Sequence, residues 1–439
     1  MSSIDYPPDH PQRVELAGEV HARPPGPVTT PSRASYVAVL VAAEARAAET
    51  RHLQALCRRW DVAPPSQEAT HFRAQLGALR LKWERHGEFS GYTFFVDGLP
   101  ETPFESTAIS SLPAGWLSAI PGQTVAAVHA EITSGDARVP DPDALARRFG
   151  NAAVVGSSVA EGAGMLFTDF RLQDDGCSRV WLVNERLTPT QAGRIVQRMF
   201  EIEVYRVLAL LALPIARRQT PRIAAIEQAL ATLTDQMATH DDAAGPGKDA
   251  SQRDEALLHE LMMLAAEVES GIAASQFRFG ACEAYHGLVR SRIAELREQR
   301  LAGLQTIDEF MGRRLAPAAA TCATTAQRLR SLAERIGQTS ALLATRVGIA
   351  NERQNQGLLA SMNQHARLQL RLQQTVEGLS VAAIVYYAAG LTGYVAKALR
   401  GVGLQIEPDL VVGVSIPLLA ALLLWSMRRM RARLGIEPH

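Results

Sequence analysis

Two uncharged apolar windows near the C-terminus constrain this chain more than any other feature. The first window covers residues 378–396 and the second covers 410–427, with only a short segment between them. A helix of the first window's length extends about 28 Å, close to the roughly 30 Å of a bilayer's hydrocarbon core. The windows therefore predict a two-helix transmembrane hairpin. A buried helical hairpin in a soluble core is the alternative, although two successive windows of this kind are rare in soluble domains.

Basic residues flank this hairpin on its outer sides. Arginines follow the second window at Arg428, Arg429, Arg431 and Arg433 and precede the first at Arg367 and Arg371, whereas the connecting loop balances Lys397 and Arg400 against Glu407 and Asp409. Positive flanks face the cytoplasm. We therefore expect a multi-pass protein of the bacterial inner membrane with both termini cytoplasmic and a basic tail at 428–439. The first residues lack the basic and apolar regions of a signal peptide.

Charge and cysteine usage exclude some partners. The chain has 45 basic and 45 acidic residues among 439, so no net field attracts nucleic acid, and we expect no nucleic-acid partner. The four cysteines form no CxxC pair and are typical of reduced thiols in a cytosolic setting.

Residues 1–218 mix strand and helix patterns. Apolar and charged residues alternate in "GALRLKWER", "YTFFV" is its expected hairpin partner, and Asp175-Gly176 predicts a tight turn between two further strands. Asp141-Pro142 and the capping box Thr188/Gln191 predict helix starts. The pattern predicts an α+β cytoplasmic domain with a mostly antiparallel sheet, whose strand order stays open.

Residues 219–377 are predicted to form a long-helix stalk or bundle. A polar stretch at 238–255 predicts a linker, and breaks are expected near Gly303 and Pro317. The next proline after Pro317 is Pro408, so one helix from about residue 319 is predicted to continue into the first apolar window. Two arrangements remain open: an antiparallel bundle with its amide-rich face in water, or a coiled-coil stalk whose amides face each other around a symmetry axis.

Several blocks resemble a known family. They include "GEVHARPP", "LKWERHGEFSGYTF", "TDFRLQDDGCSR", "EFMGRRLAPAAATC" and "LQLRLQQTVEGLSVAAIVYY". In this order they resemble the bacterial membrane-anchored proteins grouped as domain of unknown function 3422. The resemblance implies membrane anchoring and brings no established reaction or catalytic residue.

The architecture also resembles the CorA-type magnesium channels, which are pentamers whose long helices line a pore. The acidic loop "QIEPDL" is similar to theirs, but "AGLTGY" stands where those channels have Gly-Met-Asn. The favoured function is therefore membrane-anchored binding or scaffolding, in a homo-oligomer. An ion channel or transporter with this architecture is the alternative, and a metal ion would then be a partner.

Polar clusters in the first domain supply the candidate binding residues. Glu19, His21 and Arg23 would share one face of an extended chain, where they either bind an anion or metal or fix an N-terminal arm. In "KWERHGEF", Trp83 is predicted to point inward, whereas Glu84 and His86 point outward, with Glu88 beside them, as a binding site or a solvated face. Asp169 and Arg171 are predicted on one strand face, where a cross-strand ion pair is favoured over catalysis.

The first apolar window contains few groups that could line a pore or pack helices. The polar candidates are Ser380, Tyr386, Tyr387 and Thr392, and Ala389 with Gly393 forms a small-xxx-small pair that favours helix association. No GxSxG, HExxH or GxxxxGK[ST] motif occurs. We therefore expect no enzymatic activity and no cofactor, and leave a metal site undetermined.

Overall fold

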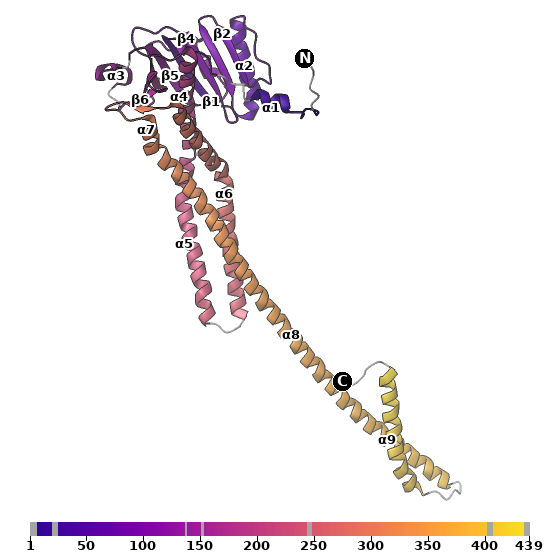
Figure 1. The fold of residues 1–439 in the computed structure, drawn as a ribbon. Coiled ribbons are helices and arrows are strands. Elements are labelled where there is room, and N and C mark those ends of the chain that lie inside the picture. Colours follow the sequence, from indigo (N-terminus) through magenta and orange to yellow (C-terminus); the bar gives the residue numbers. More distant parts are fainter. Residues whose placement is uncertain are drawn as a thin grey trace. The chain divides into compact units, whose positions relative to one another are not determined.

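The structure is a computed structural model that describes residues 7–19, 25–136, 138–150, 153–243, 248–401 and 407–433 (Figure 1). Its contacts divide the chain into two compact units. The sheet unit comprises Met1–His240 and His259–Ser340, and the hairpin unit comprises Asp241–Leu258 and Ala341–His439. The predicted domain boundaries at residues 218, 377 and 427 rest on sequence patterns and stay predictions.

The sheet unit contains one nine-stranded sheet within the described residues. The strands are β1 Ser32–Leu40, β2 His71–Leu76, β3 Leu79–Arg85, β4 Phe89–Asp97, β5 Gln123–Ser134, β6 Val155–Val159, β7 Gly164–Thr168, β8 Ser178–Asn184 and β9 Gln299–Arg300. Their spatial order is β2-β3-β4-β1-β5-β8-β7-β6-β9. All neighbouring pairs are antiparallel except β5 and β8. The predicted α+β fold with a mostly antiparallel sheet is confirmed.

Helices account for most of the remaining chain. They are α1 Arg13–Glu19, α2 Arg46–Arg59, α3 Pro142–Phe149, α4 Pro189–Leu210, α5 Leu213–Ala243, α6 Lys248–Leu296, α7 Ile307–Arg314, α8 Ala316–Gly401 and α9 Pro408–Arg433, with short 3-10 turns at Ala43–Ala45, Ala108–Ser111 and Leu117–Ala119. The caps predicted at Asp141 and Thr188 both form. The predicted linker is helical through Ala243 and again from Lys248, because its alanines and charged residues favour helix. Residues 244–247 lie outside the described residues.

Side chains alternate between the two faces of the central strands. On one face, Trp83, Tyr92 and Phe94 pack against α2 in an apolar core. Within α2, the buried Glu49 accepts hydrogen bonds from Trp83 Nε1 at 3.1 Å and from the Tyr92 hydroxyl at 2.7 Å. On the opposite face, Tyr36 of β1 stacks on Phe200 of α4, with ring centroids 5.2 Å apart. Both faces of β1, β3 and β4 are therefore covered.

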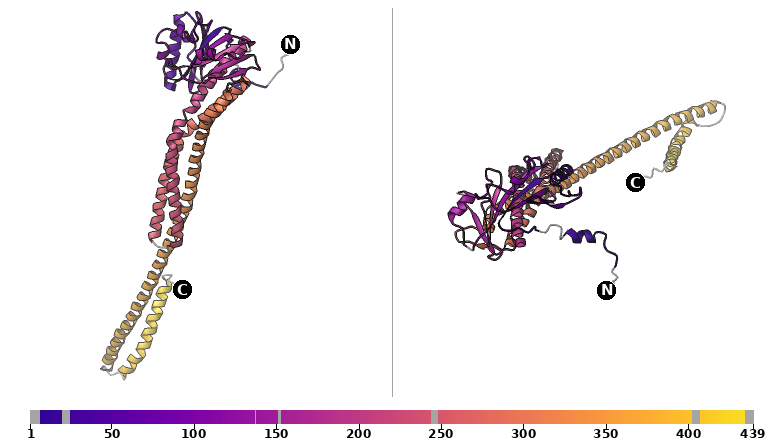
Figure 2. Two further views of the ribbon diagram at one scale, coloured as in Figure 1. Left: turned by 90° about the vertical axis from the view of Figure 1, so that its left-hand side faces the viewer. Right: turned by 90° about the horizontal axis from the view of Figure 1, so that it is seen from above.

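A helical bundle completes the sheet unit. Figure 2 shows α5, α6 and the first part of α8 side by side. Arg328 of α8 binds Glu227 of α5 with Nη2 and Oε2 2.7 Å apart, and Leu329 is buried near Gly271 of α6. The long helix predicted after Pro317 is present as α8.

The hairpin unit contains the rest of α8 and α9. Both α8 and α9 are long and apolar enough to cross a membrane by length and composition. Their contact is made by small residues: Ala389 and Ala396 are buried, and a Cβ at Gly393 would lie 3.0 Å from Val412 Cγ2. The C-terminal apolar helices of the predicted fold class are thus confirmed as candidate spans.

Candidate functional site

A polar cavity of about 320 Å³ lies between α4 and the sheet. Its lining includes Tyr36 from β1, Lys82 and Glu84 from β3, and Phe89 and Thr93 from β4; α4 contributes Gln197, Arg198, Glu201 and Tyr205, and α6 contributes Arg292. The volume is at the lower end of the range for small-molecule sites. We call this space the α4 cavity.

A buried ion pair forms the sheet side of the α4 cavity. Lys82 Nζ lies 2.9 Å from Glu84 Oε2, and both side chains are about one-tenth exposed. Lys82 also donates a hydrogen bond to Gln197 Oε1 on α4 at 3.2 Å. Residues two apart on a strand point to the same face, so the period-2 pattern that buries Trp83 on one side places this pair under α4 on the other.

A second charged group joins α4 to α6 at the edge of the cavity. Glu201 accepts hydrogen bonds from Gln197 Nε2 at 2.8 Å and Arg198 Nη1 at 3.1 Å. It also pairs with Arg292 of α6, which reaches Glu295 with Nη1 and Oε1 2.6 Å apart. Through Gln197 this group is continuous with the Lys82–Glu84 pair, so one network of charge-assisted hydrogen bonds lines the cavity.

Aromatic rings supply the remaining wall. Tyr205 of α4 stacks on Tyr285 of α6 with ring centroids 5.6 Å apart and meets Phe89 edge-on at 6.3 Å. Burial raises the pKa of Tyr205 to about 12 and raises the pKa of Tyr36 well above its usual value. Both phenols are therefore protonated at neutral pH. Among the described residues neither hydroxyl has a hydrogen-bond partner, although both residues line the α4 cavity.

The predicted "KWERHGEF" cluster is the part of the sequence that reaches this cavity. Trp83 points into the apolar core as predicted. Glu84 and His86 line the α4 cavity. The sequence predicted that these two side chains lie either on a solvated strand face or in a binding site, and in the structure α4 covers this face of the strand. The His86 ring stacks on Phe89 with centroids 4.3 Å apart. Glu84 is thus buried and paired rather than solvated.

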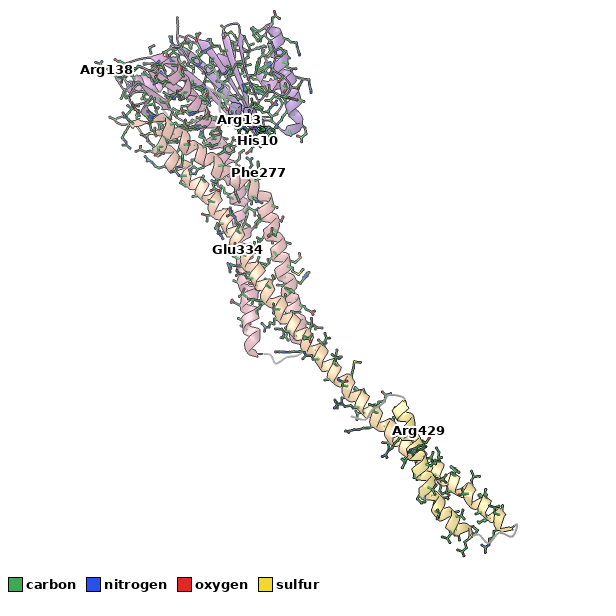
Figure 3. All side chains as sticks on the ribbon, turned by 45° about the vertical axis from the view of Figure 1, so that its right-hand side comes forward. His10, Arg13, Arg138, Phe277, Glu334 and Arg429 are labelled. Carbon is green, nitrogen blue, oxygen red and sulfur yellow. The ribbon has the colours of Figure 1, made fainter. Side chains whose placement is uncertain are left out.

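Glu88 lies next to the cavity and ties the sheet to α6. Its carboxylate binds Arg278 and accepts a hydrogen bond from the Tyr285 hydroxyl at 3.2 Å. Phe277, labelled in Figure 3, is 66% exposed, and the Arg278 guanidinium lies 4.5 Å from its ring centroid. The contacts of Glu88 are structural, and they position the helix that carries Arg292.

Two other predicted groups do not form a site. Asp169 and Arg171 follow the end of β7 at Thr168 rather than sharing a strand face. Asp169 Oδ1 accepts the Arg171 N–H at 3.1 Å and Oδ2 accepts from Gln173 Nε2 at 2.8 Å, so the carboxylate stabilises a turn. The strand ends here because Phe170 adopts φ +55°. His21 and Arg23 lie outside the described residues, as does the Glu19 side chain.

The residues predicted for the first apolar window have different surroundings. The Thr392 and Ser415 hydroxyls lie 3.1 Å apart, so Thr392 faces α9 of its own chain. Ala389 and Gly393 lie on the same contact face. The Ser380 hydroxyl donates to Val376 O in its own helix at 2.9 Å. Tyr386 and Tyr387 are 77% and 72% exposed.

Sequence reasoning missed the α4 and α6 residues of the cavity. Arg198, Glu201 and Arg292 have the i, i+3 spacing of ordinary surface ion pairs, Arg198 with Glu201 and Arg292 with Glu295. The available signal is the helical spacing of Ile195, Val196, Met199 and Phe200, which predicts that one face of α4 is buried.

The fold and the cavity define a class of protein with two parts. One part is an α+β domain with a charged cavity, and the other is a long helix that ends in a pair of apolar helical segments. The family model described as "Protein of unknown function (DUF3422)" matches residues 8–434. The chain belongs to this family.

No curated protein matches the chain. Among solved structures, the chain is similar to one described as the structure of the full-length CmaX protein, with 12% identity over 71% of this chain and 94% of that chain and a TM-score of 0.16.

Proposed function

We propose that this protein is a membrane-anchored binding protein whose α4 cavity holds a small polar solute. The observation that carries the proposal is the cavity lining, which combines three cations, two carboxylates and two protonated phenols. Such a lining offers both donors and acceptors, so it fits a zwitterion of about amino-acid size better than an apolar ligand. The solute binds and leaves unchanged, without enzymatic activity or cofactor.

The anchor is the α8–α9 hairpin. Apolar residues such as Leu391, Leu418 and Leu422 are exposed there, and burying them in lipid removes this surface from water. Arginines at both outer ends support an orientation with both termini in the cytoplasm of the bacterial inner membrane. The lipid bilayer is then the first partner, and the sheet unit faces the cytoplasm.

Binding is tested by thermal unfolding of the purified chain with a panel of amino acids and small zwitterions. We expect at least one to raise the unfolding temperature saturably, and Tyr36→Phe to weaken its binding at least tenfold by removing one hydroxyl. Tyr285→Phe is the control, because its hydroxyl binds Glu88 outside the cavity. Equal affinity in Tyr36→Phe and the wild type would exclude the α4 cavity as the binding site.

Orientation is tested with Glu407→Cys, which places a thiol between the two apolar helices. The four natural cysteines are buried, so they give little background labelling. We expect a membrane-impermeant maleimide to label Glu407→Cys in spheroplasts, and Glu44→Cys in the sheet unit to be labelled only after lysis. The reverse pattern would show that the sheet unit lies outside the cytoplasm.

A channel is the second candidate. It is supported by Tyr386 and Tyr387, which are exposed in the single chain and so are available to contact another copy. In this proposal α8 helices associate around an axis and a metal ion passes between them. Because Thr392 contacts Ser415, a pore would depend on the tyrosines.

A further inference from the structure

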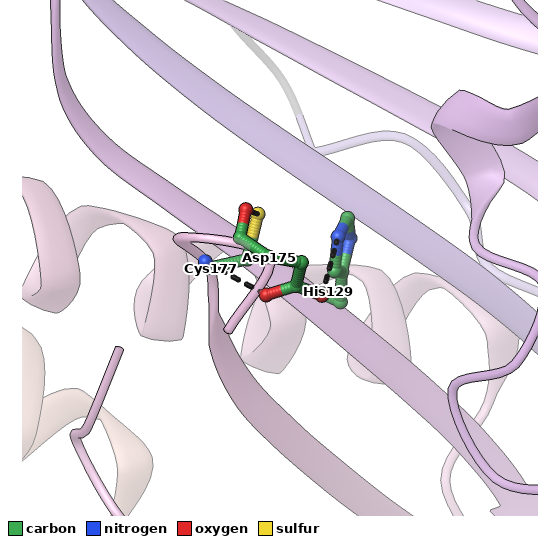
Figure 4. Close-up of side chains that lie close together, drawn as sticks. All are labelled: His129, Asp175 and Cys177. Carbon is green, nitrogen blue, oxygen red and sulfur yellow. Dashed lines mark hydrogen bonds and ion pairs between the residues drawn. The ribbon is translucent and has the colours of Figure 1, made fainter. Parts of the chain in front are cut away.

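We propose that His129, Asp175 and Cys177 form a binding site for a zinc-like divalent cation, on the sheet face opposite the α4 cavity. The three residues lie together in Figure 4. One ligand atom from each, an imidazole nitrogen, a carboxylate oxygen and the thiol sulfur, lies within 4.8 Å of the others. This site is separate from the proposed function and does not depend on it.

The parallel pairing of β5 with β8 brings the three side chains together. His129 is the second paired residue of β5, opposite Arg179, and the register begins at Val128 and Ser178. Asp175 and Cys177 lie in the turn that leads into β8, where Gly176 takes φ +76°. The start of β8 therefore places the turn directly beside His129.

The spacing of the donor atoms suits one small cation. His129 Nε2 and Asp175 Oδ2 are 3.8 Å apart, too far for a hydrogen bond. A tetrahedral zinc ion with bonds of about 2.0 to 2.2 Å to nitrogen and oxygen sets these two donors about 3.3 to 3.6 Å apart. The observed separation is a few tenths of an ångström longer, so small rotations of the Asp175 and Cys177 side chains bring all three donors to one ion.

Neighbouring hydrogen bonds fix which atoms face the ion. Ser35 Oγ lies 2.9 Å from His129 Nδ1, so Nε2 is the nitrogen directed at Asp175. Asp175 Oδ1 accepts the Cys177 N–H at 2.9 Å, which leaves Oδ2 toward His129. Metal-binding histidines commonly have such a partner on the second ring nitrogen. Ser35 is fully buried, so it orients the ring and is no accessible nucleophile.

Both donors bind a metal in their deprotonated forms. A neutral imidazole donates the Nε2 lone pair of His129, and Cys177 binds as a thiolate. A bound cation deprotonates a coordinating thiol, so one proton leaves Cys177 when the ion binds.

The donor set selects the kind of metal. Calcium and magnesium take oxygen ligands almost exclusively, whereas zinc and cobalt accept mixed nitrogen, oxygen and sulfur donors. Three protein ligands leave a fourth position for water or a solute. Asp175 is exposed, so the ion can enter from solvent on its side.

The test is a cobalt titration of the purified full chain after treatment with a chelator. We expect one Co²⁺ per chain, a thiolate-to-cobalt charge-transfer band, and loss of the band with one equivalent of Zn²⁺. Cys177→Ser removes the band. Asp175→Asn keeps the turn, because the amide oxygen still accepts the Cys177 N–H, and weakens cobalt binding at least tenfold.

Matched variants separate coordination from folding. Asp174→Asn changes the neighbouring carboxylate and Cys282→Ser removes a distant thiol, and both should keep the wild-type spectrum and affinity. Ser35→Ala should retain the band and weaken binding about tenfold to a hundredfold. Circular dichroism checks that each variant is folded. No charge-transfer band in the folded wild type, or a band that survives in folded Cys177→Ser, overturns the proposal.

Discussion

At the scale of single residues, the central feature is a lysine and a glutamate buried under α4. Removing both charges from water costs several kcal/mol per ion, which only close pairing and further hydrogen bonds offset. Lys82 has both, through Glu84 and Gln197. The network is therefore sensitive to the loss of any one member.

Glu84→Gln is expected to lower the free energy of unfolding by about 3 kcal/mol, because it leaves the Lys82 ammonium buried without its counter-charge. Denaturant unfolding followed by tryptophan fluorescence measures the change. Adding Lys82→Met should restore most of the loss, since no buried charge then remains. Glu44→Gln on the surface is the control, and it should change the free energy of unfolding little. An effect of Glu84→Gln as small as that of the control would contradict a buried ion pair.

The raised pKa of the Tyr205 phenol predicts that the protein loses stability at alkaline pH. The pKa of Tyr205 is raised to about 12 by burial, whereas an unfolded tyrosine ionises near pH 10. The folded state thus favours the protonated phenol, so this contribution is full below about pH 10 and is lost as pH rises to about 12. Relative to Tyr205→Phe, the wild type should lose about 2 kcal/mol over this interval.

Unfolding titrations of the two proteins at several pH values measure the difference. Parallel pH dependence in the wild type and Tyr205→Phe would show that the Tyr205 phenol ionises normally. Phenolate absorbance supplies a second measurement. The part of the wild-type absorbance change that is absent in Tyr205→Phe should titrate near pH 12.

At the scale of elements, α4 is held against the chain that precedes β1. Val28 N donates to Pro189 O at 2.9 Å, and a Cβ at Gly193 would lie 1.9 Å from Gly26 O. Glycine is required there because backbone, rather than a flexible side chain, occupies the space. The close approach also brings Gly26 and Gly193 to the wall of the α4 cavity.

Gly193→Ala should therefore destabilise the protein by about 1–3 kcal/mol, although alanine is the better helix former. Gly337→Ala in α8 is the matched control: nothing lies within 4 Å of its Cβ position, so it should be neutral or stabilise by up to about 1 kcal/mol. Thermal unfolding of both variants provides the comparison. A stabilised Gly193→Ala would mean that the preceding chain does not pack on α4.

The contact between α8 and α9 leads to a cross-linking prediction. The Thr392 and Ser415 hydroxyls are 3.1 Å apart, so Thr392→Cys with Ser415→Cys should form a disulfide within one chain under mild oxidation in membranes. The product keeps the monomer mass and changes gel mobility. Tyr386→Cys with Ser415→Cys is the control, because Tyr386 is exposed. Cross-linked dimers from the first pair would instead place another copy beside Thr392.

Elements were more predictable than the site because local chemistry determines them. Capping residues set the starts of α3 and α4, and the absence of proline after Pro317 predicted α8. The Asp169 turn was missed because the residues of "MLFTDFRL" alternate through it, and the positive φ of Phe170 has no sequence signal. The cavity joins Lys82 to Arg292 across 210 positions, and periodicity along one element carries no information about such a contact.

At the scale of the whole molecule, the number of copies separates the two proposed functions. Native mass spectrometry of the detergent-purified chain should give no more than a dimer for an anchored binding protein. A closed ring, especially a pentamer, would favour the channel and justify ion-flux assays with Tyr386 and Tyr387 variants. The buried Ala389–Gly393 face is already used within one chain, so we expect association to involve the exposed tyrosines.

The shortest strand has a consequence for biosynthesis. β9 covers the outer edge of β6 by pairing Gln299 with Ser158 and Arg300 with Ser157, and Glu298 accepts a hydrogen bond from the Ser157 hydroxyl 141 positions earlier in the chain. At about 5–20 residues per second, a ribosome needs roughly 7 to 28 s to make the intervening residues. Until β9 is made, β6 has no partner on its outer side, and an open sheet edge is the structure that most readily pairs with another chain. The growing polypeptide is therefore most prone to aggregation while the α5–α6 hairpin is being translated.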